Sequence, residues 1–181
     1  MIKMGKYVEK ELVFNFPDEL TWKELDVQGR KIPKGMALVD LVIERDSDCL
    51  LVEIKDPSNS AAPEKERNNY LKRLQNNSVL EEELVPKVRD SYTYEHLMER
   101  DHKPFVYIVL IGLESFSEPV QTGLLSMFGD RLHKAIRNES DTPWIREHIS
   151  RCTVLSIPMW NRRFKDWQVS RLSVKATKAS D

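Results

Sequence analysis

The sequence predicts one α/β domain in which helices pack against a sheet. Three observations predict it: two runs rich in Val, Ile and Leu are joined by a polar tetrapeptide, a long helical stretch follows, and a continuous apolar run separates that stretch from a second amphipathic helix. The 181 residues contain no internal repeat and no long linker rich in Pro or Gly. We therefore expect a single domain over residues 1–181.

The first half of the chain is expected to form strands. Residues 11–16 alternate well enough for a strand and are followed by a proline, and residues 29–35 form a loop with a glycine at each end. Residues 36–44 and 49–55 are the clearest strands. The polar residues 45–48 between them predict a hairpin loop.

The second half is expected to alternate helices with strands. Residues 63–100 are helical in character, and Pro86 either kinks one helix or opens a second one in its first turn. The apolar run 105–111 is typical of a central strand covered on both faces. Residues 117–136 predict an amphipathic helix, and residues 152–157 predict a last strand that ends at a proline.

Composition and cysteine usage exclude several classes of protein. The sequence has no apolar run of about 18 residues, and its start has no apolar stretch of signal-peptide length, so we expect a cytoplasmic protein without a membrane span. Cys49 and Cys152 lie in strand-like runs and belong to no CxxC pattern or Cys/His cluster. We expect both to be buried, unreactive thiols rather than a disulfide or a zinc site.

The charge of the chain is nearly balanced but unevenly distributed. A net charge of -1 lacks the basic signature of a duplex-binding domain. Residues 151–181 hold seven basic and two acidic side chains, so this segment carries +5 and the first 150 residues carry -6. This asymmetry permits an anionic partner at one surface.

One face of the expected hairpin gathers charged side chains. If Glu44 and Cys49 are the last opposed pair, Asp40 lies opposite Glu53, and Lys55 follows on the same face one pleat further along. Facing carboxylates repel each other unless a cation or proton lies between them. Oxygen ligands without His or Cys select a hard ion such as Mg²⁺ or Mn²⁺, and a lysine beside that ion suits phosphodiester hydrolysis.

These residues resemble a known motif. The pattern Val39-Asp40, a spacer of twelve residues, and then Glu53-Ile54-Lys55 looks like the PD-(D/E)xK motif of the restriction-endonuclease-like nucleases, with Val39 in place of the motif's proline. The resemblance implies that Asp40, Glu53 and the Ile54 backbone carbonyl hold Mg²⁺ or Mn²⁺, and that Lys55 is the catalytic lysine. It also implies an αβββαβ core with a central mixed sheet.

The resemblance sets out how the chain would be organised. The core would span about residues 8–111, and residues 112–181 would add a helix and strand as a C-terminal extension. Four segments are also similar to a family of uncharacterised bacterial proteins classed with these nucleases. They are residues 14–16, 39–58, 87–91 and 160–172.

Two further groups of residues are candidates for the same site. Many nuclease folds take another acidic group from the first helix, and Glu11, Glu19 and Glu24 are all available, with no reason in the sequence to choose among them. Related nucleases often place a phosphate contact on the helix after the motif, where the candidates are Lys87, Arg89 and Ser91. The alternative is that Arg89 pairs with a nearby Glu.

The C-terminal segment interleaves arginines with aromatic residues. Arg162, Arg163 and Arg171 could clamp phosphates while Trp160, Phe164 and Trp167 stack on bases. The alternative, which we favour, is that these aromatics cap the core and the arginines are solvated.

The sequence therefore supports one leading hypothesis and two rivals. The leading hypothesis is a metal-dependent phosphodiesterase that acts on DNA, with RNA as the alternative substrate. The first rival is a catalytically silent nuclease fold that binds a protein partner. The second is an enzyme that works only inside a complex whose partner supplies DNA recognition. Restriction-like nucleases often work as homodimers, but the sequence shows no clear interface stripe.

Overall fold

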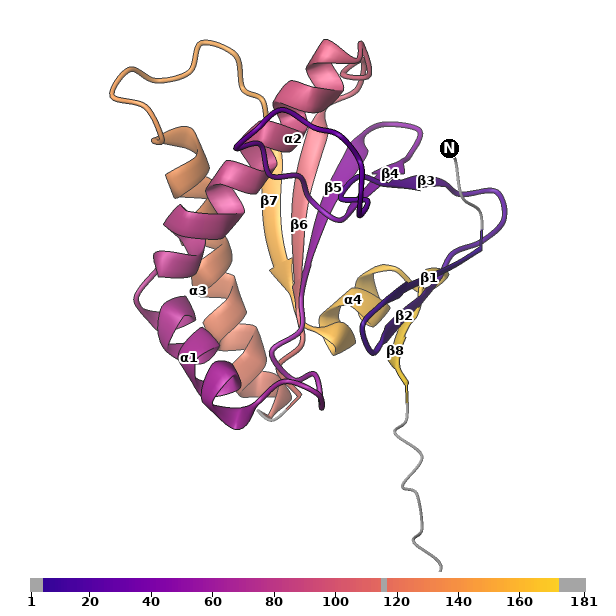
Figure 1. The fold of residues 1–181 in the computed structure, drawn as a ribbon. Helices are drawn as coiled ribbons and strands as arrows, with labels where there is room; N and C mark the ends of the chain where they lie inside the picture. Colours follow the sequence, from indigo (N-terminus) through magenta and orange to yellow (C-terminus); the bar gives the residue numbers. More distant parts are fainter. Residues whose placement is uncertain (1–4, 115–116, 173–181) are drawn as a thin grey trace, which may run out of the picture.

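A five-stranded mixed sheet lies between two other layers in the computed structural model, which describes residues 5–114 and 117–172 (Figure 1). β4 and β5 are antiparallel, as are β3 and β4, whereas β6 and β7 run parallel to β5. In spatial order the strands are β3 (Thr21–Glu24), β4 (Leu41–Glu44), β5 (Cys49–Lys55), β6 (Phe105–Ile111) and β7 (Arg151–Leu155). The expected mixed α/β class is confirmed.

Helices cover one face of this sheet, on the left in Figure 1. Side chains of alternate residues on β4, β5 and β6, such as Val42, Leu51 and Tyr107, pack there with Val88 and Leu125 from the helices. The helical layer contains α1 (Glu64–Gln75), the π-helix η1 (Leu80–Leu84), α2 (Val85–Leu97) and α3 (Glu118–Arg137).

A small sheet and a short helix cover the other face. This layer packs aromatic side chains such as Phe14, Trp22 and Trp160 against the intervening residues of the central strands. It contains β1 (Lys6–Glu9), β2 (Leu12–Asn15), β8 (Val169–Arg171) and α4 (Ile157–Arg163), with the three strands in the order β1-β2-β8. The chain therefore has two apolar cores, one on each side of the central sheet.

The hairpin has the register expected from the sequence. Glu44 pairs with Cys49 and Val42 pairs with Leu51, which brings Asp40, just before β4, to the level of Glu53. β4 is nonetheless shorter than the expected strand 36–44. The N–H groups of two residues before it donate to α2 side chains instead of to a neighbouring strand: Ala37 to Asp90 Oδ2 at 2.9 Å and Val39 to Ser91 Oγ at 2.8 Å.

The expected helical stretch 63–100 is interrupted at residues 76 and 77. Asn77 adopts a left-handed conformation there, with φ of 66°, and Pro86 lies in the first turn of α2. Helical backbone continues from η1 into α2 through Leu84 and Val85, so the break between the helices lies at residues 76–77 and Pro86 does not open the second one. Pro158 likewise does not simply end a strand, because it lies in the first turn of α4.

The finer expectation of an αβββαβ core is met only in part. In the described part of the chain, no helix precedes the antiparallel strands β3, β4 and β5, because the backbone of residues 6–15 is paired as β1 and β2. Within the expected C-terminal extension, β7 joins the central sheet and β8 pairs with β2. A restriction-endonuclease-like core is therefore not established by this fold.

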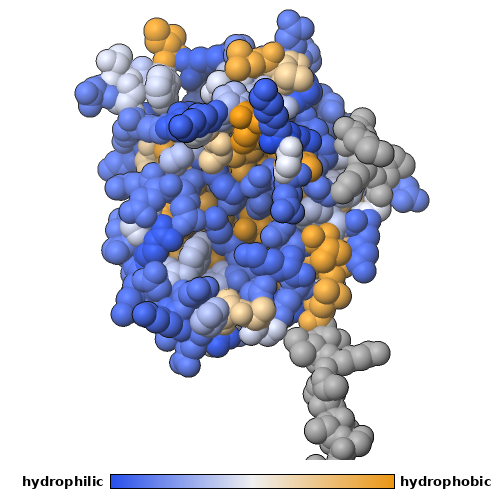
Figure 2. Space-filling view, viewed as in Figure 1, coloured by the Kyte–Doolittle hydropathy of each residue, from blue (hydrophilic) through white to orange (hydrophobic). Residues whose placement is uncertain are grey.

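The surface is mainly hydrophilic and both cysteines are free thiols. Figure 2 shows a face covered mainly by hydrophilic side chains, with scattered apolar ones. Among the residues that the structure describes, no helix combines the length and apolar character needed to cross a membrane. Both cysteines are free thiols, with Cys49 buried and Cys152 partly buried.

Candidate functional site

Glu53 is a buried carboxylate at the centre of a charged cluster. It lies on β5 with its side chain toward the helical layer, because alternate residues of that strand face the same core as Leu51. Its side chain is 1% exposed, and two lysines surround it. Lys87 Nζ lies 2.8 Å from Oε1 and 3.1 Å from Oε2, and Lys55 Nζ lies 3.1 Å from Oε1.

Asp40 provides a second carboxylate beside Glu53. Its Oδ2 accepts the Ile54 N–H at 2.6 Å, so the carboxylate is tied to the strand that carries Glu53. Burial, and after it the negative charge of Glu53, raises the pKa of Asp40 to about 7, even though Lys87 and the Ile54 hydrogen bond act in the opposite direction. Near neutral pH this carboxyl group therefore exists in both its protonated and its charged form.

Lys55 lies between two carboxylates. Its Nζ is 3.1 Å from Glu53 Oε1 and 2.8 Å from Glu83 Oε2. Burial alone would lower the pKa of Lys55, but the charges and hydrogen bonds of Glu53 and Glu83 outweigh burial and raise it. Lys55 is therefore a fixed cation in the metal-free protein and not a base.

The π-helix η1 places Glu83 at this site. Glu83 Oε1 also lies 2.6 Å from Arg73 Nη1 on α1, so its side chain is held from two sides. The lysine and the arginine outweigh burial and lower the pKa of Glu83. Single turns of π-helix often occur at functional sites, because the wider turn redirects side chains. The sequence reasoning missed Glu83, since the direction of a helical side chain depends on this local irregularity.

Two buried phenols lie close to the carboxylates. Tyr107 donates to the Leu84 carbonyl oxygen at 3.3 Å, whereas the Tyr70 hydroxyl is buried without a hydrogen bond in the parts of the chain that the structure describes. Burial, together with the charges of Glu53 and Glu83, raises the pKa of Tyr70. Burial and then Glu53 raise the pKa of Tyr107. Both phenols therefore remain neutral and give the site low polarity on one side.

The carboxylates could hold a hard cation, but they do not form a complete shell by themselves. Residues 5–114 and 117–172 contain no group of three or more His, Cys, Asp or Glu arranged to hold a metal. Asp40, Glu53 and the Ile54 carbonyl offer oxygen atoms only, and Mg²⁺ commonly completes such a set with water and phosphate. Glu53 Oε1 is buried and, although near two lysines, accepts no well-directed hydrogen bond. Asp40, Glu53 and the Ile54 carbonyl would need water and phosphate oxygens to complete a shell for Mg²⁺ or Mn²⁺.

The remaining candidates from the 87–91 segment point in different directions. Lys87 reaches Glu53, whereas Arg89 pairs with Asp90 and Glu139. Ser91 is fully buried, and its hydroxyl accepts the Val39 N–H. The expectation that Ser91 contacts a phosphate is therefore wrong, because its hydroxyl holds the chain before β4 and does not reach solvent. A phosphate contact by Arg89 stays a prediction.

The C-terminal arginines do not lie at Asp40 and Glu53. Arg162 pairs with Glu118 on α3, and the Arg163 guanidinium lies 5.8 Å from the centre of the Phe164 ring. Arg171 binds Asp56 through both terminal nitrogens, at 2.9 and 2.8 Å. The aromatic residues of this segment pack into the second core, with Trp160 fully buried, as the favoured alternative predicts.

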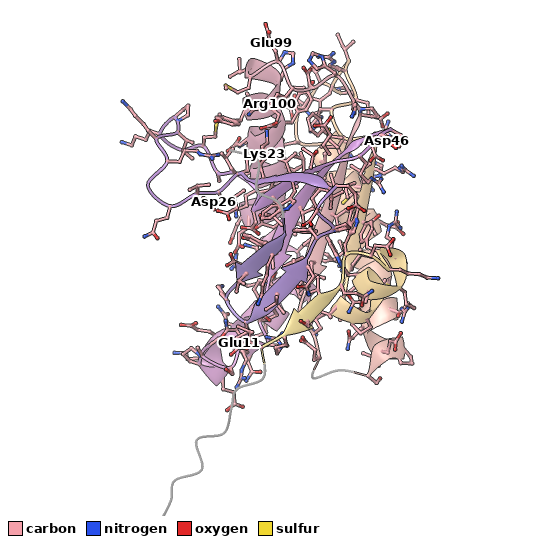
Figure 3. All side chains as sticks on the ribbon, turned by 90° about the vertical axis from the view of Figure 1, so that its right-hand side faces the viewer. Glu11, Lys23, Asp26, Asp46, Glu99 and Arg100 are labelled. Atoms are coloured by element: carbon pink, nitrogen blue, oxygen red, sulfur yellow. The ribbon has the colours of Figure 1, made fainter. Side chains whose placement is uncertain are left out.

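An upstream acidic residue that the sequence reasoning did not consider lies beside the cluster. Asp26, on the loop after β3, has its Oδ2 3.9 Å from Lys87 Nζ. Glu11 instead bonds to Ser60 and Arg171, and Figure 3 shows it near the bottom of the molecule, well below Asp26. Glu19 lies exposed in the turn before β3, and Glu24 is the last residue of that strand.

Comparison with known proteins adds no relative. A scan against protein-family models, a search of curated proteins and a search of solved structures each gave no match.

Proposed function

We propose that the protein is a metal-dependent phosphodiesterase that hydrolyses nucleic acid, either DNA or RNA. The observation that carries the proposal is the pair of carboxylates, Asp40 just before β4 and Glu53 on β5, with Lys55 next to Glu53. Burial, and after it the nearby charge of Glu53, raises the pKa of Asp40, so this carboxylate pair costs free energy to keep inside the protein. Such an arrangement is common where a cation is bound.

Each residue has a chemical role in this proposal. Asp40, Glu53 and the Ile54 carbonyl hold the cation, and a bound Mg²⁺ or Mn²⁺ supplies an acidified water and neutralises phosphate charge. Lys55 stays protonated, so it orients the attacking water and stabilises the negative charge that develops on the phosphate. Glu83 positions Lys55 by pairing with it at 2.8 Å.

Metal binding and cleavage together test the proposal. Calorimetry with Mn²⁺ and Mg²⁺ is run on the wild type and on the Asp40→Asn/Glu53→Gln variant, with folding checked by circular dichroism. Cleavage of single-stranded, duplex and branched DNA, and of RNA, is then measured for Asp40→Asn and Lys55→Ala. We expect the double variant to lose metal binding and each single variant to lose about 100-fold or more in rate, as when one transition-state donor is removed.

Matched controls separate the site from general damage. Asp46→Asn changes an exposed hairpin residue, and Lys103→Ala removes a lysine that pairs with exposed Glu44. Both should keep wild-type metal binding and cleavage. Unchanged cleavage in Asp40→Asn and Lys55→Ala would refute the assignment.

A second candidate function has its own support. Lys55 and Lys87 already compensate the charges of Glu53 and its neighbours, so the cluster needs no metal to be electrically satisfied. This favours a catalytically silent nuclease fold that acts with a protein partner. Such a module would bind neither Mn²⁺ nor nucleic acid, whereas a nuclease should bind nucleic acid with a salt dependence of several phosphates.

A further inference from the structure

Lys87 occupies the space in front of Glu53 from which a cation would have to bind. Its Nζ lies within 3.1 Å of both carboxylate oxygens, and its positive charge also lowers the pKa of Asp40. Lys87 comes from the first turn of α2, and its side chain is 18% exposed, so it lies at the boundary between the buried carboxylate and solvent.

A metal ion and the Lys87 ammonium cannot both bind the carboxylate oxygens of Glu53 at the same time. Two positive charges a few ångströms apart in a partly buried site repel each other, and each needs the same oxygen atoms. Glu53 is only 1% exposed and carried by a central strand, so it has little freedom to turn. Lys87 has a flexible four-carbon stem, so it is the group that moves.

Asp26 offers the displaced ammonium another partner. Its Oδ2 is 3.9 Å from Lys87 Nζ, and its side chain is 54% exposed. Reaching it requires a change in side-chain torsions and no movement of the backbone, and the ammonium keeps one carboxylate partner throughout. The loop after β3 thus lies beside Lys87 on the side facing solvent.

We propose that Lys87 is a displaceable internal cation, which neutralises Glu53 in the metal-free protein and moves to Asp26 when a divalent ion binds. This inference rests on the proposed function, since it presupposes a metal site at Asp40 and Glu53. It implies that Lys87 stabilises the metal-free protein and, by competing for Glu53, lowers the affinity for metal. The apparent affinity is lowered by the fraction of molecules in which Lys87 has left Glu53.

Mn²⁺ binding by calorimetry tests the displacement without any substrate. Lys87→Met and Lys87→Gln should bind Mn²⁺ more tightly than the wild type, by at least about fivefold, the lower end of usual couplings between sites. Lys103→Met is the matched control, because Lys103 pairs with Glu44, which lies opposite the first residue of β5, far from Glu53. The affinity of this control variant for Mn²⁺ should stay at the wild-type value. Tight binding by the variants with none by the wild type would also support the proposal.

A double-mutant cycle tests the role of Asp26. Asp26→Asn should weaken Mn²⁺ binding in the wild type, because the displaced ammonium loses its partner, and should have no effect in the Lys87→Met background. Equal weakening in both backgrounds would instead make Asp26 a direct metal ligand and overturn its role as the partner of Lys87.

Thermal unfolding gives a second readout. Without metal, Lys87→Met should melt below the wild type because Glu53 loses its closest cation, and saturating Mn²⁺ should raise the melting temperature of this variant more than that of the wild type. If wild type and Lys87 variants bind Mn²⁺ equally, the displacement is refuted while the metal site stands. If none of them binds, the proposed function fails, and the displacement fails with it.

Discussion

Arg171 connects the small sheet to the central one, and its removal gives a quantitative test of the fold. It lies on β8, and its guanidinium binds Asp56, the residue after β5, through two hydrogen bonds of 2.9 and 2.8 Å. The Asp56 side chain is 1% exposed. Arg171 also binds Glu11 at 3.0 Å and Glu114 at 2.6 Å, so one guanidinium pairs with three carboxylates.

The perturbation is Arg171→Met, which keeps most of the side-chain volume and removes the charge. Breaking a buried ion pair from one side costs about 3–5 kcal/mol, because a buried charge is left without a partner. Arg171 is 25% exposed, so water can partly replace it, and we expect the lower end, about 3 kcal/mol. For a chain of this length that corresponds to a fall in melting temperature of about 6–12 °C.

Urea unfolding and calorimetric melting measure this loss. Arg162→Met is the control, since Arg162 and Glu118 are 57% and 51% exposed, and such a pair contributes at most about 1 kcal/mol. Arg171→Met/Asp56→Asn should be more stable than the single variant, because the buried charge has gone. The reasoning is refuted if Arg171→Met and the Arg162→Met control have the same melting temperature. It is also refuted if adding Asp56→Asn restores none of the stability that Arg171→Met loses.

Three further predictions follow from the packing and electrostatics. Gly112→Ala should destabilise by about 1–3 kcal/mol in urea unfolding, because its Cβ would lie 2.6 Å from Asp56 Oδ1, whereas Gly123→Ala on α3, with nothing within 4 Å, should be neutral or stabilising. The raised pKa of Asp40 means that folding favours its protonated form, so its contribution to the free energy of unfolding is complete below about pH 4 and is lost as the pH rises through about 7. In metal-free buffer this contribution to the free energy of unfolding is at most about 4 kcal/mol, and Asp40→Asn should remove that part of the pH dependence. If the free energy of unfolding of wild type and variant changes with pH in the same way, this prediction is wrong. Ser91→Ala should cost about 1–3 kcal/mol by leaving the buried Val39 N–H without its acceptor, and hydrogen exchange at that amide should accelerate, whereas wild-type protection would show that the bond is dispensable.

The hairpin could be predicted because its information is local. The polar residues 45–48 fix the turn, and the period of two then determines which side chains lie opposite each other, so Asp40, Glu53 and Lys55 could be placed on one face. The long apolar runs of β5 and β6 likewise predict buried strands without reference to the rest of the chain.

The sequence-based predictions that failed concern features that depend on contacts between residues far apart in the chain. β4 begins late because Asp90 and Ser91, about fifty residues away, bind the N–H groups before it. Strands β1, β3 and β8 have only three or four residues each, too few to show a period, and exist through pairing. For the same reason the spacing of the 87–91 segment could not show that Lys87 meets Glu53 while Ser91 is buried.

The pairing of β8 with β2 also has a consequence during synthesis of the chain. Leu12 and Phe14 on β2 are fully buried, yet their strand neighbour β8 comes from residues 169–171, and Arg171 reaches Glu11 across 160 positions of sequence. A ribosome therefore releases the first strands long before the partner that covers them has been made. Until then these apolar side chains have an incomplete core, and contacts of such long sequence separation form slowly. We therefore expect the nascent protein to be most prone to aggregate before β8 has left the ribosome.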